Sequence, residues 1–198
     1  MSTVSYLRGL AVTNACLRQL GETELASEEE SHPLSGDAKA IREQVLESSQ
    51  ARGWWYNIEY PTLSPEVTGI ISVPNDTLSV MSDDLRFRVA QRGRKLWDQT
   101  NSTDSFTVPI KVRLIRKVEL DDLPLTAFDY VLEETVRRFL SGLDADNAKI
   151  AGAEGRAKAA YAQMHSEHIR AFAANAADAN PTIQRIRSLR GWAAGGVR

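Results

Sequence analysis

The hydrophobic period changes twice along this chain, and that change is the feature that most constrains its fold. Apolar residues recur at three- and four-residue steps near the N-terminus and again from about residue 122, as in amphipathic helices. Between these regions, short apolar runs alternate or are interrupted by proline and glycine, which is typical of short strands and turns. We therefore predict an α+β fold, in which a helical bundle built from both chain ends carries an inserted small antiparallel sheet or sandwich.

The predicted boundaries divide the chain into three parts. Residues 1–52 and 122–180 are expected to form one helical-bundle domain, and residues 53–121 an inserted β domain. Residues 181–198 are expected to form a C-terminal tail that contacts a partner. With 198 residues, of which 42 % are hydrophobic, the chain is long enough to bury a sizeable core.

Four helices are expected. The first spans about 4–20 and is followed by Gly21, which favours the left-handed cap conformation. The second spans about 37–51 and ends at Gly53. The other two are a strongly amphipathic helix from about 122 to 142 and a long alanine-rich helix from about 144 to 175.

The middle of the chain reads as short strands. Residues 54–59 are aromatic and β-branched, and residues 86–89 alternate between arginine and apolar side chains. Residues 92–94 predict a hairpin tip. The longest strand is expected within residues 106–118, with one apolar face made by Val108, Ile110, Val112 and Leu114.

The net charge of −2 excludes a generally basic coat for nucleic acid, yet the charge is uneven. Residues 1–52 hold five basic and eight acidic side chains, whereas the last eighteen residues hold four arginines and no acidic side chain. The arginines Arg185, Arg187 and Arg190 leave three interpretations open: a solvated end, a contact with a partner protein, or a contact with DNA phosphates.

Few residues suit catalysis or metal binding. Cys16 is a lone thiol on an apolar helix face, so we expect a core residue. His165 and His168 lie one helical turn apart without an evident third ligand, so we expect exposed helix-surface histidines and no metal. The Gly152–Arg156 segment lies within a helix and lacks the preceding strand of a phosphate loop. No cofactor and no membrane-spanning segment are expected.

Carboxylates are the one residue type in this sequence that is numerous enough to suggest catalysis. Adjacent pairs occur at residues 83–84, 121–122 and 133–134, and a run of three at 28–30. Neighbours in sequence usually diverge into solvent, so we interpret them as turn, cap and surface charges. We expect no enzyme, but a glycan hydrolase that uses paired carboxylates remains as an alternative function. A regulatory binding module of host type is a second alternative.

The Trp54-Trp55 pair has two interpretations. Consecutive side chains of a strand point to opposite faces, so at most one ring would be exposed. One tryptophan is expected in the core and the other at an interface or a domain junction.

One segment supports a more specific identification. Residues 50–59, with the sequence QARGWWYNIE, close a helix and open the strand region, and they resemble the tail tubular protein A family of short-tailed bacteriophages. Further segments resemble this family in the same order along the chain: residues 14–22, 73–76, 92–100, 104–106, 114–116 and 122–124. The resemblance covers roughly residues 5–172.

The resemblance implies a structural virion protein, made in the host cytoplasm and placed in the viral tail. Members of the family form a ring, expected to be a homododecamer, between the portal protein and the tail nozzle formed by tail tubular protein B. Double-stranded DNA passes through the lumen and tail fibres dock nearby. The residues expected to contact partners are Trp54, Trp55, Arg92, Trp97, Arg185, Arg187 and Arg190.

Overall fold

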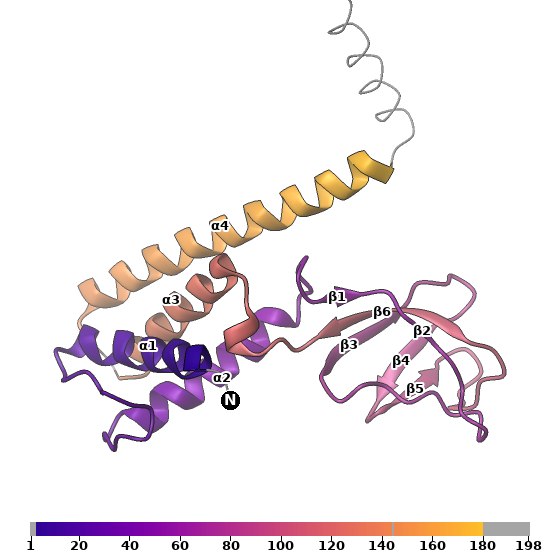
Figure 1. Cartoon of the computed structure of the whole chain (residues 1–198), viewed down its shortest axis with the longest axis horizontal. Coiled ribbons are helices and arrows are strands. Elements are labelled where there is room, and N and C mark those ends of the chain that lie inside the picture. The colour runs from indigo at the N-terminus through magenta and orange to yellow at the C-terminus, as the bar shows by residue number, and fades with distance from the viewer. Residues whose placement is uncertain (1–2, 144, 180–198) are drawn as a thin grey trace, which may run out of the picture.

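The computed structural model describes residues 3–143 and 145–179, and its helices and strands occupy different halves of the molecule (Figure 1). Helices from both ends of the chain flank the strand region, so the predicted α+β class is confirmed. The helices are α1 (Thr3–Leu20), α2 (Ser35–Gln50), α3 (Leu125–Gly142) and α4 (Asn147–Ala179), with a 3-10 turn at Leu120–Asp122. The strands are β1 (Ile58–Glu59), β2 (Thr62–Leu63), β3 (Thr77–Ser82), β4 (Val89–Arg92), β5 (Lys95–Asp98) and β6 (Ile110–Arg116).

The end of α1 follows the predicted capping pattern. Gly21 takes a φ of +79°, a conformation that costs glycine little because it has no Cβ. The amides of Gly21 and Glu22 then donate to the carbonyls of Arg18 and Leu17, each at 3.1 Å. These two bonds satisfy carbonyls that the helix end would otherwise leave unpaired.

Helix α3 lies at the centre of the helical half and packs against α1, α2 and α4. Its strongly amphipathic sequence accounts for this position, because Val131, Val136, Phe139 and Leu140 are all buried. Cys16 of α1 is also fully buried, which confirms its prediction as a core residue, and burial raises its pKa to about 12.

Strand β6 is the centre of the four-stranded antiparallel sheet. Strand β3 pairs along one edge of β6, whereas β1 and β2 pair with successive parts of its other edge. Alternate residues of β6 are therefore buried on one face, and Ile110, Val112 and Leu114 enter an apolar cluster made within the strand half.

Strands β4 and β5 form a separate hairpin whose two-residue loop is Gly93-Arg94. Gly93 has a φ of +60°, as the first loop position of a tight hairpin favours. The predicted hairpin tip is therefore confirmed. Leu96 of β5 is buried in the same cluster as β6.

Three strand predictions were wrong in detail. Residues 54–57 are not a strand, because they turn before β1 begins at Ile58. Val108 is 45 % exposed, since β6 begins only at Ile110. The alternating residues 86–88 precede β4, where Arg86 binds Asp84 in a local turn instead of extending.

Candidate functional site

Two segments connect the helices to the strands, and two buried amide side chains tie them together. The Gln50 side chain donates to the Val118 carbonyl and accepts from the Val118 amide, both at 2.8 Å. Asn57 donates to the carbonyls of Gln50 and Arg116 and accepts from the Trp54 amide. The chain therefore leaves and re-enters the helical half at one fixed place.

The left-handed turn at Gly53 lets the chain pass close to β6. Its φ is +80°, and a Cβ there would lie 2.9 Å from atoms of Arg113 and of Ile115. Glycine therefore suits this position for two independent reasons, the backbone conformation and the space.

Trp54 and Trp55 follow this turn and lie in different environments. Trp54 is 3 % exposed in the helical core, and its indole Nε1 donates to the Ser49 carbonyl at 2.7 Å. Trp55 is half-buried and meets the ring of Tyr56 edge-on, at 5.1 Å between centroids. We expected one tryptophan in the core and one at an interface or domain junction, and the structure has one buried and one partly exposed ring. The two residues lie in a turn and not in a strand.

Helix α4 presents an aromatic row to this junction. The Trp54 ring meets Tyr161 and His168 edge-on, at 6.0 Å and 5.3 Å. His168 also packs on Phe172 at 4.7 Å. Burial, followed by the charges of His165 and Arg113, lowers the pKa of His168. The prediction of an exposed histidine was therefore wrong for His168, which is half-buried, and right for His165.

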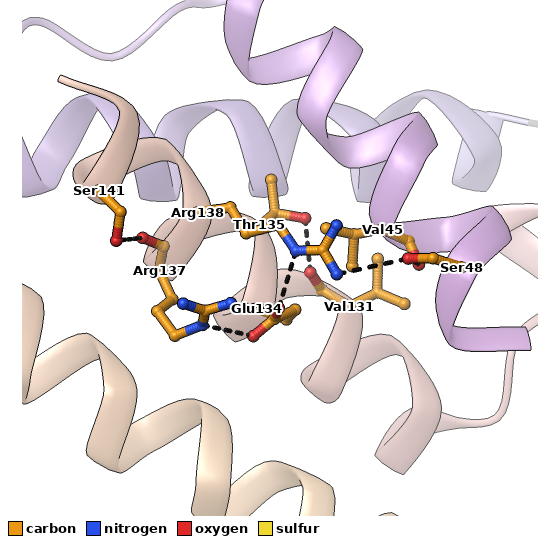
Figure 2. Close-up of polar contacts among 8 residues, drawn as sticks. All are labelled: Val45, Ser48, Val131, Glu134, Thr135, Arg137, Arg138 and Ser141. Atoms are coloured by element: carbon orange, nitrogen blue, oxygen red, sulfur yellow. Dashed lines mark hydrogen bonds and ion pairs between the residues drawn. The ribbon is translucent and has the colours of Figure 1, made fainter.

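A buried carboxylate, Glu134 of α3, lies near the aromatic row (Figure 2). Glu134 accepts from Arg137 Nε at 2.7 Å and from Arg138 Nε at 2.8 Å, and Arg138 also reaches Ser48 of α2 at 3.4 Å. Burial acts to raise the pKa of Glu134, but hydrogen bonds from the two arginines outweigh it and the pKa is lowered. The prediction of a surface charge was wrong for Glu134, because residues of α2 and α4 pack around it. Helical spacing places both arginines beside the buried carboxylate.

A small groove joins the aromatic row to the Glu134 cluster. Its volume is about 220 Å³, and Arg52, Tyr161, Glu134 and Arg138 are among its lining residues. Arg52 donates to the Tyr161 hydroxyl at 2.7 Å across it. Side chains that line the groove therefore bond to one another across it, and these contacts hold α2, α3 and α4 together.

Arg92 and Trp97 lie far from this junction, on the β4–β5 hairpin. The Arg92 guanidinium lies over the Trp97 ring, 3.9 Å from its centroid. Trp97 is half-buried and Arg92 is exposed, so the pair presents a cation to solvent above a partly covered ring. The structure therefore separates the expected partner residues into a junction pair and a hairpin pair. Arg185, Arg187 and Arg190 lie outside the described residues.

Most of the adjacent carboxylates are bound by basic side chains. Asp83 binds Lys111, Glu133 binds Arg156, and Asp84 binds Arg86. The Arg86 hydrogen bond lowers the pKa of Asp84 to about 2, whereas a general acid needs a raised pKa. These contacts give the glycan-hydrolase alternative no support.

Neither a metal cluster nor a membrane-spanning helix is found among residues 3–143 and 145–179. No group of three or more histidine, cysteine, aspartate or glutamate residues in this part of the chain could hold a metal ion. None of the helices in the described ranges combines the length and the apolar character needed to span a bilayer.

Sequence reasoning missed Gln50, Asn57 and Glu134 as organising residues. Their roles depend on partners far away in the chain or on burial, which no local pattern shows. The Glu134-Arg137-Arg138 spacing was the one readable signal, since i, i+3 and i, i+4 pairs meet on a helix.

Comparisons with known proteins cover both halves of the molecule. A family model described as Tail tubular protein matches residues 10–181. Tail tubular protein A of Klebsiella phage KP34 is 25 % identical to the chain over 142 residues, which make up 71 % of this chain and 76 % of that protein. The range matched by the family model includes the Trp54-Trp55 junction and the Arg92–Trp97 hairpin pair.

Proposed function

The chain belongs to the tail tubular protein family, and from that premise we propose that it forms an adaptor ring between the portal and the tail nozzle of a short-tailed bacteriophage. Membership makes it a structural component of the virion tail, as the resemblance of residues 50–59 predicted. The ring, its dodecameric size, its contacts with portal, nozzle and fibre proteins, and the passage of DNA through its lumen are the proposed part. We propose no catalytic role.

The observation that carries this proposal is the family match over residues 10–181, which takes in helices and strands alike. Separate apolar clusters, two within the helical half and one within the strand half, support the predicted division into a helical-bundle domain and an inserted β domain. Two halves joined at one hydrogen-bonded junction suit a protein that must contact different partners at its two ends.

Helix α4 supplies a surface for such contacts. Its 33 residues span about 50 Å, whereas the 18 residues of α3 span about 27 Å, so α4 projects beyond the bundle (Figure 1). Ile169 and Phe172 lie in the C-terminal half of α4 and are 53 % and 41 % exposed. Exposed apolar side chains of this size favour a protein contact.

The charge of the chain is compatible with a DNA conduit. Tight binding of DNA phosphates depends on an excess of basic side chains, and this chain has a net charge of −2. We therefore expect DNA to pass through the lumen without binding tightly to the protein. We propose that residues 181–198, with their four arginines, contact the portal.

Gradient sedimentation of the chain with purified portal rings tests the proposal. Co-migration of the full chain, and its loss when residues 181–198 are deleted, is the expected result. Circular dichroism of the deleted chain serves as the folding control. Independent migration of a folded full chain and intact portal rings would contradict the adaptor role, and unchanged binding after deletion would contradict the role of the tail.

A further inference from the structure

Two oppositely charged surfaces lie in opposite halves of the molecule. The basic hairpin, residues 86–95, holds five basic and no acidic side chains. The acidic loop, residues 22–30, holds five glutamates and no basic side chain. In Figure 1 the loop that joins α1 to α2 lies at the left end, whereas β4 and β5 lie in the strand half on the right.

Several charges of the basic hairpin have no ion-pair partner among the described residues. Arg86 binds Asp84, and Lys95 lies 3.6 Å from Asp104. The exposed Arg88, Arg92 and Arg94 make no ion pair with any residue that the structure describes.

Several glutamates of the acidic loop likewise have no lysine or arginine partner among the described residues. Glu24 binds Arg18 and Glu28 binds Arg42. Glu22, Glu29 and Glu30 are exposed and have no lysine or arginine partner within the described ranges.

Both surfaces are held in shape before any partner binds. The Asn14 side chain bonds the amide and the carbonyl of Leu25, each at 2.9 Å, and Leu25 is buried. On the hairpin, the Arg92 guanidinium lies over the Trp97 ring, a cation–π contact that restrains the arginine while the residue stays exposed. Preorganised surfaces bind with a smaller loss of entropy.

We propose that the basic hairpin of one copy binds the acidic loop of a second copy of this chain. This interface rests on the ring proposed above. The contact joins two different surfaces of identical subunits, so it is heterologous and closes into a ring when the rotation between copies allows. Ionic contacts between exposed charges weaken with salt, so assembly through this interface falls as ionic strength rises.

Disulfide trapping tests the interface, because the native Cys16 is buried and does not compete. A chain carrying Glu29→Cys is mixed with a size-tagged chain carrying Arg94→Cys, and the mixture is oxidised mildly. The experiment is done in two conditions, with the chains free in solution at high concentration and with the chains bound to portal rings. The matched control replaces Arg94→Cys by Arg170→Cys, an exposed arginine on α4. The expected result is a linked pair several-fold more abundant than the control and reduced in high salt.

Charge reversal gives a second measurement. The triple variant Arg88→Glu, Arg92→Glu, Arg94→Glu is expected to lose self-association, and mixing it with Glu22→Lys, Glu29→Lys is expected to restore it. Linked pairs no more abundant than the control in both states would overturn the interface. Binding of DNA at physiological salt that the triple variant loses, without linked pairs, would assign the hairpin to phosphates and also overturn it.

Portal binding is scored separately in the same gradients. Chains that load on the portal without linked pairs would contradict this interface and leave the adaptor intact. Chains that fail to load would contradict the adaptor itself.

Discussion

Gln50 and Val118 lie sixty-eight positions apart, and two hydrogen bonds of 2.8 Å join the side chain of one to the backbone of the other. Gln50 is fully buried at the end of α2, and Val118 follows β6. The pair therefore holds together the outgoing and returning segments at the junction between helices and strands.

Replacing Gln50 with alanine should destabilise the fold. The change leaves the amide and the carbonyl of Val118 without these partners, which costs on the order of 2–3 kcal/mol. Urea unfolding measures the effect, with Gln163→Ala on the exposed face of α4 as the control. Equal unfolding free energies for the two variants would contradict the role given to Gln50.

Gly53 should tolerate alanine poorly. The positive φ and the close approach of Ile115 act together, and we expect a loss of about 1–3 kcal/mol. Gly155→Ala is the matched control, because Gly155 lies in α4 and a Cβ added there would have nothing within 4 Å, so alanine should stabilise by up to about 1 kcal/mol. Thermal unfolding of both variants tests the contrast, and a stabilised Gly53→Ala would refute it.

Glu134→Gln should lower stability in a pH-dependent way. The folded pKa lies below the ordinary 4.5, so the carboxylate contributes stability above that value and loses it as the pH falls through the folded pKa. The wild type should exceed the variant by about 1–2 kcal/mol at pH 7. Denaturant titrations from pH 7 to pH 3 should show the gap closing, whereas a constant gap would mean that the charge is not responsible.

His168 should make the fold sensitive to mild acid. Its folded pKa lies below the ordinary 6.5, so the unfolded chain takes up the proton more readily and stability falls as the pH drops below 6.5. His168→Phe keeps the aromatic contacts with Trp54 and Phe172 and removes the titration. The variant should show a shallower loss of stability between pH 7 and pH 5 than the wild type, and identical slopes would contradict this assignment.

The sequence predicted the helices better than the segments between them. The three- and four-residue spacing and Gly21 located α1 within about one residue at each end, because these signals are local. The Trp54-Trp55 segment reads as a strand by composition, yet Asn57 captures the Trp54 amide and turns the chain. Long-range contacts such as Gln50 with Val118 leave no periodic trace in the sequence. The spacing of Glu134, Arg137 and Arg138 indicates that the three can pair on one helix, but it does not show that Glu134 is buried.

The candidate contact surfaces were predictable in part. The tryptophan pair and the Arg92–Trp97 segment stood out by residue type and by resemblance to the family. Their separation into a junction and a hairpin depends on the sheet topology, in which β4 and β5 form a sheet apart from β6.

Negative-stain electron microscopy of the full chain mixed with portal rings of the same phage tests the central claim most directly. The account predicts an added layer of density on one end of the portal, with dodecameric symmetry. A folded chain and intact portal rings that show no added layer would contradict it.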